Sequence, residues 1–222
     1  MDALTKQYFD ATTVTIKDQT DKAVTHWFDG DLLSLARLSG APRQSTLTIS
    51  YWKGIGFELV ATGPNIGGEM VRRILQQEHT KQPSLFIQNV AFELPVDLQR
   101  QKIGVRSLAI ELYEAQRTGQ FAHVAVSAAG NASTLNPEHP RDYLNGYLVW
   151  PLLGFDGPIP AHKLQALYPH QRVSQVLATP GGDQAWASHG DYCQLQFDLT
   201  EGAESWIVLK QYLQDNRIEV TP

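Results

Sequence analysis

The stretch LFIQNVAFEL at residues 85–94 is the most strand-like segment of the chain, and Pro95 ends it. After a polar linker, residues 104–119 carry apolar side chains on one helical face and finish on a glycine, which is typical of an amphipathic helix. FAHVAV at residues 121–126 follows directly, as a short apolar run typical of a buried parallel strand. The order strand, helix, strand predicts a right-handed βαβ unit with two parallel strands.

Strand and helix patterns continue on both sides of this unit. Alternating apolar residues on either side of a glycine-containing segment predict a β-hairpin over residues 47–60. The other expected elements are a short strand at 12–16, a helix at 24–38, a strand at 70–77 for which a helix is the alternative, a polar loop at 131–141, a helical turn at 143–153 bent or ended by Pro151, two helical pieces within 161–189, a strand at 193–199 and a helix at 205–214.

Composition and charge argue against some classes of function. The chain has 222 residues, of which 42% are hydrophobic, so it is long enough for one globular domain. Its net charge of −5, from 18 basic and 23 acidic residues, argues against a general nucleic-acid binder. The longest apolar stretch is far short of the ~20 residues that cross a bilayer. We therefore expect a cytoplasmic protein without nucleic-acid or membrane partners.

Three side-chain patterns are interpreted as structural. Cys193 is the only cysteine, so it excludes an internal disulfide and a cysteine-rich zinc site, and it is expected to be a small core residue. The seven histidines lack metal-ligand spacing, and we predict no metal. The pair Arg72-Arg73 is interpreted as a solvated pair at a sheet edge, with recognition of an acidic acceptor as the alternative.

The linker between the first strand and the helix of the βαβ unit is the strongest candidate site. A helix start offers unpaired backbone N–H groups and the positive end of the helix dipole, and Arg100 and Lys102 add positive side chains. A pyrophosphate is the expected ligand. The alternative is an ordinary βα turn whose basic side chains only keep it soluble.

This linker resembles the pyrophosphate loop of the GNAT superfamily of N-acetyltransferases, whose pattern is Q/R-x-x-G-x-G/A. The matching residues are Gln99-x-x-Lys102-x-Gly104. Lys102 replaces the first glycine, and a residue with a Cβ does not easily adopt positive φ. We expect either an altered turn or a looser cradle to which the lysine adds charge.

A second likeness lies downstream, where Asn145–Phe155 resembles the Y-x-x-x-G-F run of the same superfamily, in a divergent bacterial branch. Gly154-Phe155 fits the pattern, but Trp150 stands where many members place a tyrosine acid. Indole has no useful acidity, so we expect Trp150 to form a wall against pantetheine or the acceptor. Tyr147, one turn earlier, is the substitute for the acid, with core packing as its alternative role.

The resemblance implies an α+β fold: a mixed, mostly antiparallel central sheet with a splayed pair of parallel strands and helices on both faces. It implies a single domain over residues 1–222. Its parts would be an N-terminal strand and helix (1–44), a core with the acyl-CoA site (45–157), a helical insertion (158–190), and a last strand with a C-terminal helix (191–222).

The implied activity is an acyl-CoA-dependent N-acyltransferase that transfers acetyl from acetyl-CoA to a small-molecule or protein amine. Glu93 is the expected base, although a solvated strand-end carboxylate is the alternative for it, and Tyr147 is the expected acid. A catalytically inactive module that binds CoA or a protein partner remains the alternative function, and the aromatic C-terminal half allows a homodimer. The implied acetyl-CoA contacts are Phe92, Leu94, Gln99, Arg100, Gln101, Lys102, Ile103, Gly104, Val105, Asn145 and Trp150.

Overall fold

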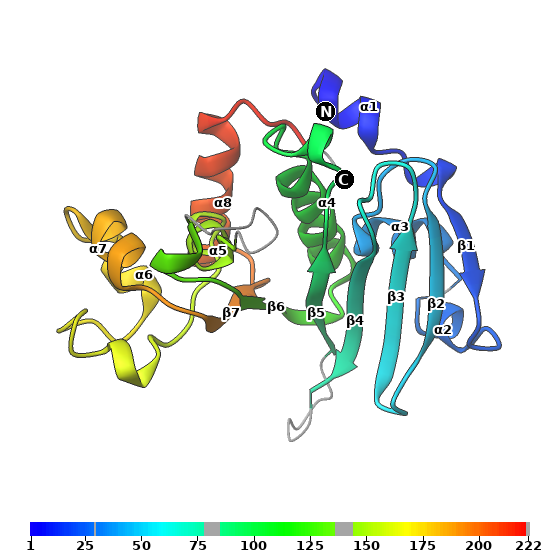
Figure 1. The fold of residues 1–222 in the computed structure, drawn as a ribbon. Helices are drawn as coiled ribbons and strands as arrows, with labels where there is room; N and C mark the ends of the chain where they lie inside the picture. Colours follow the sequence, from blue (N-terminus) through cyan, green and yellow to red (C-terminus); the bar gives the residue numbers. More distant parts are fainter. Residues whose placement is uncertain (29, 78–84, 136–143, 221–222) are drawn as a thin grey trace. The chain divides into compact units, whose positions relative to one another are not determined.

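The computed structural model describes residues 1–28, 30–77, 85–135 and 144–220. It shows an α+β fold in which seven strands form a mixed sheet in chain order, β1 to β7, and this confirms the predicted fold class (Figure 1). The strands are β1 (Thr15–Asp18), β2 (Thr46–Trp52), β3 (Gly56–Thr62), β4 (Met70–Gln76), β5 (Leu85–Phe92), β6 (Phe121–Ala128) and β7 (Cys193–Asp198).

The chain divides into two compact units. The first comprises residues 1–124, 199–201 and 213–222, and the second comprises residues 125–198 and 202–212. The helices are α1 (Ala3–Tyr8), α2 (Ala23–Trp27), α3 (Leu32–Ser39), α4 (Ile103–Thr118), α5 (Gly146–Leu152), α6 (Val173–Leu177), α7 (Gly182–His189) and α8 (Glu204–Asp215), with short 3-10 turns η1 (Ala11–Thr13), η2 (Val96–Leu98), η3 (Ala132–Leu135) and η5 (Ala161–Lys163). None of the described helices is long and apolar enough to cross a membrane.

The strands of the first unit form a mixed, mostly antiparallel sheet. β1 runs parallel to β2, whereas β2, β3, β4 and β5 are antiparallel in succession. The predicted hairpin is β2–β3, turned at Lys53 and Gly54, which both have positive φ. The predicted strand at 70–77 is β4. Because β4 lies between β3 and β5, it is not a sheet edge.

The first helical region differs from the prediction of one helix over residues 24–38. The helix breaks near Gly30, whose φ is +75°, and restarts at Asp31, whose side chain accepts a hydrogen bond of 2.9 Å from the N–H of Ser34. The expected strand at 12–16 starts only at Thr15, because Asp10 accepts from the N–H of Thr12 and caps the η1 turn instead.

Helices α3 and α4 pack side by side over the first unit's core. The Ser107 hydroxyl of α4 donates a 2.7 Å hydrogen bond to the carbonyl of Gly40, which ends α3 with a φ of +64°. A Cβ at Gly40 would lie 2.6 Å from the Ser107 hydroxyl, so this helix crossing requires glycine. Beneath the helices, buried Leu47 and Leu59 show the alternation of a strand with one covered face.

The predicted βαβ unit is β5–α4–β6, and its two strands begin side by side. The N–H of Leu85 at the start of β5 donates a 3.3 Å hydrogen bond to the carbonyl of Gln120, just before β6. The rings of Phe86 and His123 stack at 5.0 Å one step further along. This shared start and the joining helix α4 fit the predicted βαβ unit, and the parallel direction of the two strands stays a prediction. The splay of this pair stays a prediction.

The second unit packs around a row of aromatic rings. Phe155 lies 5.4 Å from Phe197, which lies 4.9 Å from Trp206. Gly154 has a φ of +90°, and a Cβ there would lie 2.2 Å from the Ser205 carbonyl oxygen. The Gly154-Phe155 pair therefore has a packing explanation within this unit: glycine admits the start of α8, and phenylalanine fills the core.

The remaining predictions for the second unit are largely confirmed. Pro151 lies in the last turn of α5, and helical turns and β7 occupy their expected positions. Cys193 is buried, as expected, and burial raises the pKa of its thiol to about 12, with smaller contributions from Asp191 and Asp156. Part of the expected loop at 131–141, from residue 136 on, lies outside the described residues.

Candidate functional site

The linker from β5 to α4 forms the candidate site, and Lys102 decides its conformation. Lys102 is the residue before α4 and has a φ of 60° and a ψ of 25°, in the left-handed region. Arg100, two residues earlier, also has positive φ, at 64°. The lysine thus takes the backbone conformation for which a glycine would be the easy choice. The positive φ of Lys102 shows that this position accommodates a side chain, and the choice between an altered turn and a looser loop with added charge stays a prediction.

Backbone N–H groups gather at this turn. Those of residues 101–105 donate to no acceptor in the parts of the chain that the structure describes. Left-handed residues that alternate with other conformations turn successive N–H groups to one side, where they make an anion-binding nest. The 16-residue helix α4 adds the positive end of its dipole at the same place. The arrangement favours a bound anion.

The basic side chains of the loop keep their charge available. Arg100 is exposed and forms no ion pair with any described carboxylate. The Lys102 ammonium donates to the side-chain carbonyl oxygen of Asn216, an uncharged partner. Neither cation is neutralised by a described acid, so both contribute positive potential beside the unpaired N–H groups.

Side-chain donors of the same loop and of α4 form hydrogen bonds with backbone carbonyls in and before the loop. Gln99 Nε2 donates to the Leu94 carbonyl at 3.1 Å, and Gln101 Nε2 donates to the Asp97 carbonyl at 2.6 Å. Arg106, in the first turn of α4, donates from Nη1 to the carbonyls of Gln101 and Lys102, each at 3.3 Å. With the carbonyls occupied in this way, the N–H side of the loop is fixed before any ligand arrives.

Arg106 is a site residue that sequence reasoning missed. It is only 6% exposed, and its guanidinium also contacts Thr5 Oγ1 and Asp2 Oδ2, each at 3.1 Å. Burial raises the pKa of Asp2, but hydrogen bonds from the Glu219 and Thr5 N–H groups and the Arg106 charge outweigh it and lower that pKa to about 2. The helical pattern places Arg106 away from the apolar face, and nothing in its spacing distinguishes it from a solvated arginine.

The end of β5 lies next to the loop. The carbonyl of Glu93 accepts a 2.8 Å hydrogen bond from the N–H of Gly67, and a Cβ at Gly67 would lie 3.0 Å from the carbonyl carbon of Leu94. The N–H groups of Glu93 and Leu94 have no acceptor among residues 1–28, 30–77, 85–135 and 144–220. The side chains of Phe92 and Leu94 lie beside Gly104, at 3.6 and 3.9 Å from the place of a Cβ.

A bulge interrupts β5 just before this end. β4 pairs Val71 with Ala91 and Arg72 with Asn89, so Val90 between them has no partner in the register. Val90 and Ala91 are both exposed. Their position gives the strand an open, apolar surface that leads toward the unpaired N–H groups of Glu93 and Leu94.

A buried polar cluster supports the bulge from the helix side. Arg72 donates from Nη1 to the Ala91 carbonyl at 3.1 Å and from Nε to Glu111 at 2.9 Å, and Asn89 Nδ2 donates to the same Glu111 oxygen at 3.2 Å. Burial raises the pKa of Glu111 to about 7, although Arg72 and Asn89 oppose the increase. Arg72 is 2% exposed, so the expectation of a solvated edge pair at 72–73 is wrong for this residue.

The remaining predicted residues lie in the second unit. Tyr147 is fully buried, its hydroxyl donates to the Ala187 carbonyl at 2.9 Å, and its carbonyl accepts from Trp186 Nε1 at 2.8 Å. These contacts favour the packing role over the acid role for this ring. Trp150 is half-buried against Phe155, with ring centroids 5.1 Å apart, and Asn145 is half-buried before the first turn of α5.

The structure therefore brings one part of the predicted site together in the first unit: Phe92, Glu93 and Leu94 with residues 99–105. In the described ranges, no three His, Cys, Asp or Glu side chains form a group that could hold a metal ion. In comparisons with known proteins, no family model and no curated protein matches this chain.

Proposed function

We propose that the loop Gln99–Gly104 binds the pyrophosphate of an acyl-CoA and that the protein is an acyl-CoA-dependent N-acyltransferase, with acetyl-CoA as donor and an amine as acceptor. The run of unpaired N–H groups from residue 101 to residue 105, at the left-handed Lys102 that precedes α4, is the observation that carries the proposal. A pyrophosphate supplies the acceptor oxygens and negative charge that these groups lack.

The strand end provides a path for the pantetheine arm. Pantetheine is an extended chain with two amide groups, and it pairs with strand backbone as a further strand would. Next to the Val90 bulge, β5 offers an exposed apolar surface and the N–H groups of Glu93 and Leu94. In this arrangement the thioester lies at the end of β5.

Direct transfer then needs one oxyanion donor and one base. The amine attacks the thioester carbonyl, the backbone N–H groups at Glu93 and Leu94 stabilise the developing oxyanion, and the CoA thiolate leaves. Glu93 is exposed at this point of the strand and takes the amine proton, directly or through a water. Solvent returns a proton to the thiolate, since the Tyr147 hydroxyl is engaged with the Ala187 carbonyl.

A binding module without catalysis is the second candidate function. The full burial of Tyr147 and the presence of Trp150 at the family's tyrosine position favour it, because neither of these two residues then supplies an acid for the thiolate. In this case the loop still binds CoA, and the amine acceptor is replaced by a protein partner. Turnover separates the two candidates.

Calorimetric titration with acetyl-CoA tests the loop. We expect the parent protein to bind and the Lys102→Glu variant to bind at least about tenfold more weakly, because the reversed charge faces the pyrophosphate. The matched control is Lys17→Glu, which reverses an exposed lysine on β1. If a folded sample binds neither acetyl-CoA, CoA nor a longer acyl-CoA, the proposal is wrong.

Release of free CoA in the presence of a panel of amines tests catalysis. The Glu93→Gln variant is expected to keep the affinity for acetyl-CoA and to lose roughly 10²–10⁴ in turnover, which is the range for removal of a general base. Binding without turnover by the parent protein, over amines of small molecules and lysine peptides, would favour the binding module.

A further inference from the structure

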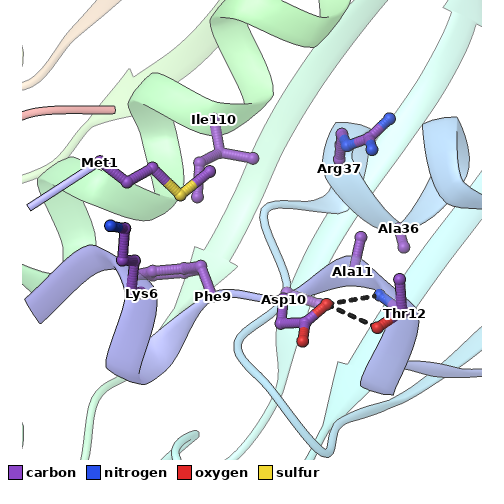
Figure 2. A pocket seen from close by; sticks show the side chains of 10 residues that line it. Met1, Lys6, Phe9, Asp10, Ala11, Thr12, Ala36, Arg37 and Ile110 are labelled. Atoms are coloured by element: carbon purple, nitrogen blue, oxygen red, sulfur yellow. Dashed lines mark hydrogen bonds between the residues drawn. The ribbon is translucent and has the colours of Figure 1, made fainter. Parts of the chain in front are cut away.

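The first unit contains a cavity that shares no residue with the acyl-CoA loop or with β5. Its volume is about 410 Å³, within the range of small-molecule sites. Figure 2 shows Met1, Lys6, Phe9 and Ile110 on one side of it and the η1 turn with Ala36 and Arg37 on the other. The lining residues are Met1, Lys6, Phe9, Asp10, Ala11, Thr12, Ala36, Arg37, Ala41 and Ile110.

The walls of the cavity are mainly apolar. Phe9, Ala36, Ala41 and Ile110 are each less than one-tenth exposed, and they come from the chain around α1, from α3 and its end, and from α4. Three of the lining side chains are alanines, including Ala11 of η1, and such short side chains leave the space between the helices unfilled. An apolar ligand gains from removal of its surface from water here.

The carboxylate that lines the cavity is already paired. Asp10 accepts hydrogen bonds from the N–H and the hydroxyl of Thr12, at 3.0 and 2.6 Å, and lies 3.8 Å from Arg43. The Thr12 hydroxyl, more than any other group, lowers the pKa of Asp10 and so keeps it charged. Figure 2 shows both bonds turned toward Thr12. Asp10 is therefore not the natural partner of a ligand cation.

The two basic side chains that line the cavity, unlike Asp10, have no close partner of opposite charge among the described residues. Lys6 forms no ion pair with a carboxylate in the described part of the chain. Arg37 has Glu114 as its nearest acid, at 3.9 Å, and Glu114 is held more closely by Arg117, at 2.6 Å. An apolar cavity whose acid is satisfied and whose two cations are poorly matched has a net attraction for an anion.

We propose that this cavity binds a medium-chain organic carboxylate, with its hydrocarbon chain against Phe9, Ala36 and Ile110 and its carboxylate attracted by the two cationic lining side chains, Lys6 and Arg37. The positive charge of these side chains selects the carboxylate over an amine of the same chain length. The apolar walls select a chain over a small polar acid such as acetate. The proposal is independent of the acyl-CoA loop, and saturating acetyl-CoA is expected to leave carboxylate binding intact.

The test is calorimetric titration with decanoate and with decylammonium, both kept below their micellar concentrations. Decanoate is expected to bind at one saturable site, and decylammonium at least about tenfold more weakly. The Lys6→Gln and Arg37→Gln variants are each expected to weaken decanoate binding several-fold. Lys17→Gln, which removes an exposed lysine outside the cavity, is the matched control and should bind as the parent does.

A second variant separates site binding from surface adsorption. Ala11→Leu places a larger side chain into the cavity from the half-buried η1 turn and is expected to abolish decanoate binding, while thermal unfolding reports that the protein is still folded. The proposal is overturned if decanoate shows no saturable binding, if decylammonium binds equally well, or if both charge variants and a folded Ala11→Leu variant bind as the parent does.

Discussion

Arg72 Nε lies 2.9 Å from Oε2 of Glu111, and the two side chains are 2% and 0% exposed. The pair joins β4 to α4 beneath the Val90 bulge. The second oxygen of Glu111 and the amide oxygen of Asn89 have no hydrogen-bond partner in the described residues. Desolvation of a buried ion pair whose acceptors are partly unsatisfied lowers the free energy of unfolding. The contribution of this pair is therefore to fix the geometry of β4 against α4.

Replacement of Glu111 by glutamine is expected to change the pH dependence of stability. Because the pKa of Glu111 is raised from 4.5 to about 7 on folding, the folded state retains a proton over this interval that the unfolded state has lost. The contribution of this group is therefore fully present below pH 4.5 and is lost as the pH rises through about 7. Urea unfolding across this interval should show a decline in the parent that is weaker in Glu111→Gln. Equal slopes in both proteins would contradict the assignment, since the histidines are common to both.

Removal of Arg72 alone is expected to be costly. Arg72→Met leaves Glu111 without its ion-pair partner and the Ala91 carbonyl without its donor, and the free energy of unfolding should fall by about 3–5 kcal/mol. The double variant Arg72→Met/Glu111→Leu removes both charges and should recover much of this loss. If the double variant is as unstable as the single one, the cost lies in packing and not in the uncompensated carboxylate.

Arg106 is expected to act on ligand binding by positioning the loop. Arg106→Gln loses the hydrogen bonds to the Gln101 and Lys102 carbonyls, so the N–H groups of the nest are no longer held in place. Acetyl-CoA affinity should fall about tenfold, and NMR order parameters of the backbone at residues 101–105 should decrease. The surface variant Arg43→Gln serves as control. Lower order parameters with unchanged affinity would contradict the positioning role.

Two glycines beside Leu94 are expected to respond oppositely to alanine. At Gly104 a Cβ would meet the Phe92 ring at 3.6 Å, an ordinary contact, and Gly104→Ala should be neutral or stabilising by up to about 1 kcal/mol because α4 begins there. At Gly67 the Cβ would lie 3.0 Å from the backbone of Leu94, so Gly67→Ala should lower the melting temperature. Thermal unfolding of the two variants side by side checks the contrast.

The sequence predicts those parts of the fold that depend on local periodicity. Segments β5, α4 and β6 each carry an unbroken pattern, and their order alone predicts the parallel unit. The break at Gly30 is harder to foresee, because the apolar spacing continues across it and only the N-cap at Asp31 marks the start of a second helix. The bulge at Val90 is set by pairing with β4, which leaves no mark in the strand's own residues.

The candidate site also has one part that the sequence predicts and another that it does not. The loop at residues 99–105 is contiguous, so its backbone follows from neighbours in the chain. The roles of Arg72 and Arg106 depend on burial against distant segments, and a helical or strand pattern assigns an arginine to solvent by default. Tyr147 shows the opposite case. Its place in the sequence predicts an acid, but its hydroxyl donates a hydrogen bond to a carbonyl of α7.

The link between Asp2 and Glu219 has a consequence for the order of folding. The Asp2 N–H donates to the Glu219 carbonyl at 3.2 Å, and the Glu219 N–H donates to the Asp2 carboxylate at 2.9 Å, across 217 positions of sequence. Contacts of such long range form late, because closure of a long loop costs chain entropy before any contact repays it. The same carboxylate accepts a hydrogen bond from Arg106, so we expect the contacts that hold the anion loop to be completed late in folding.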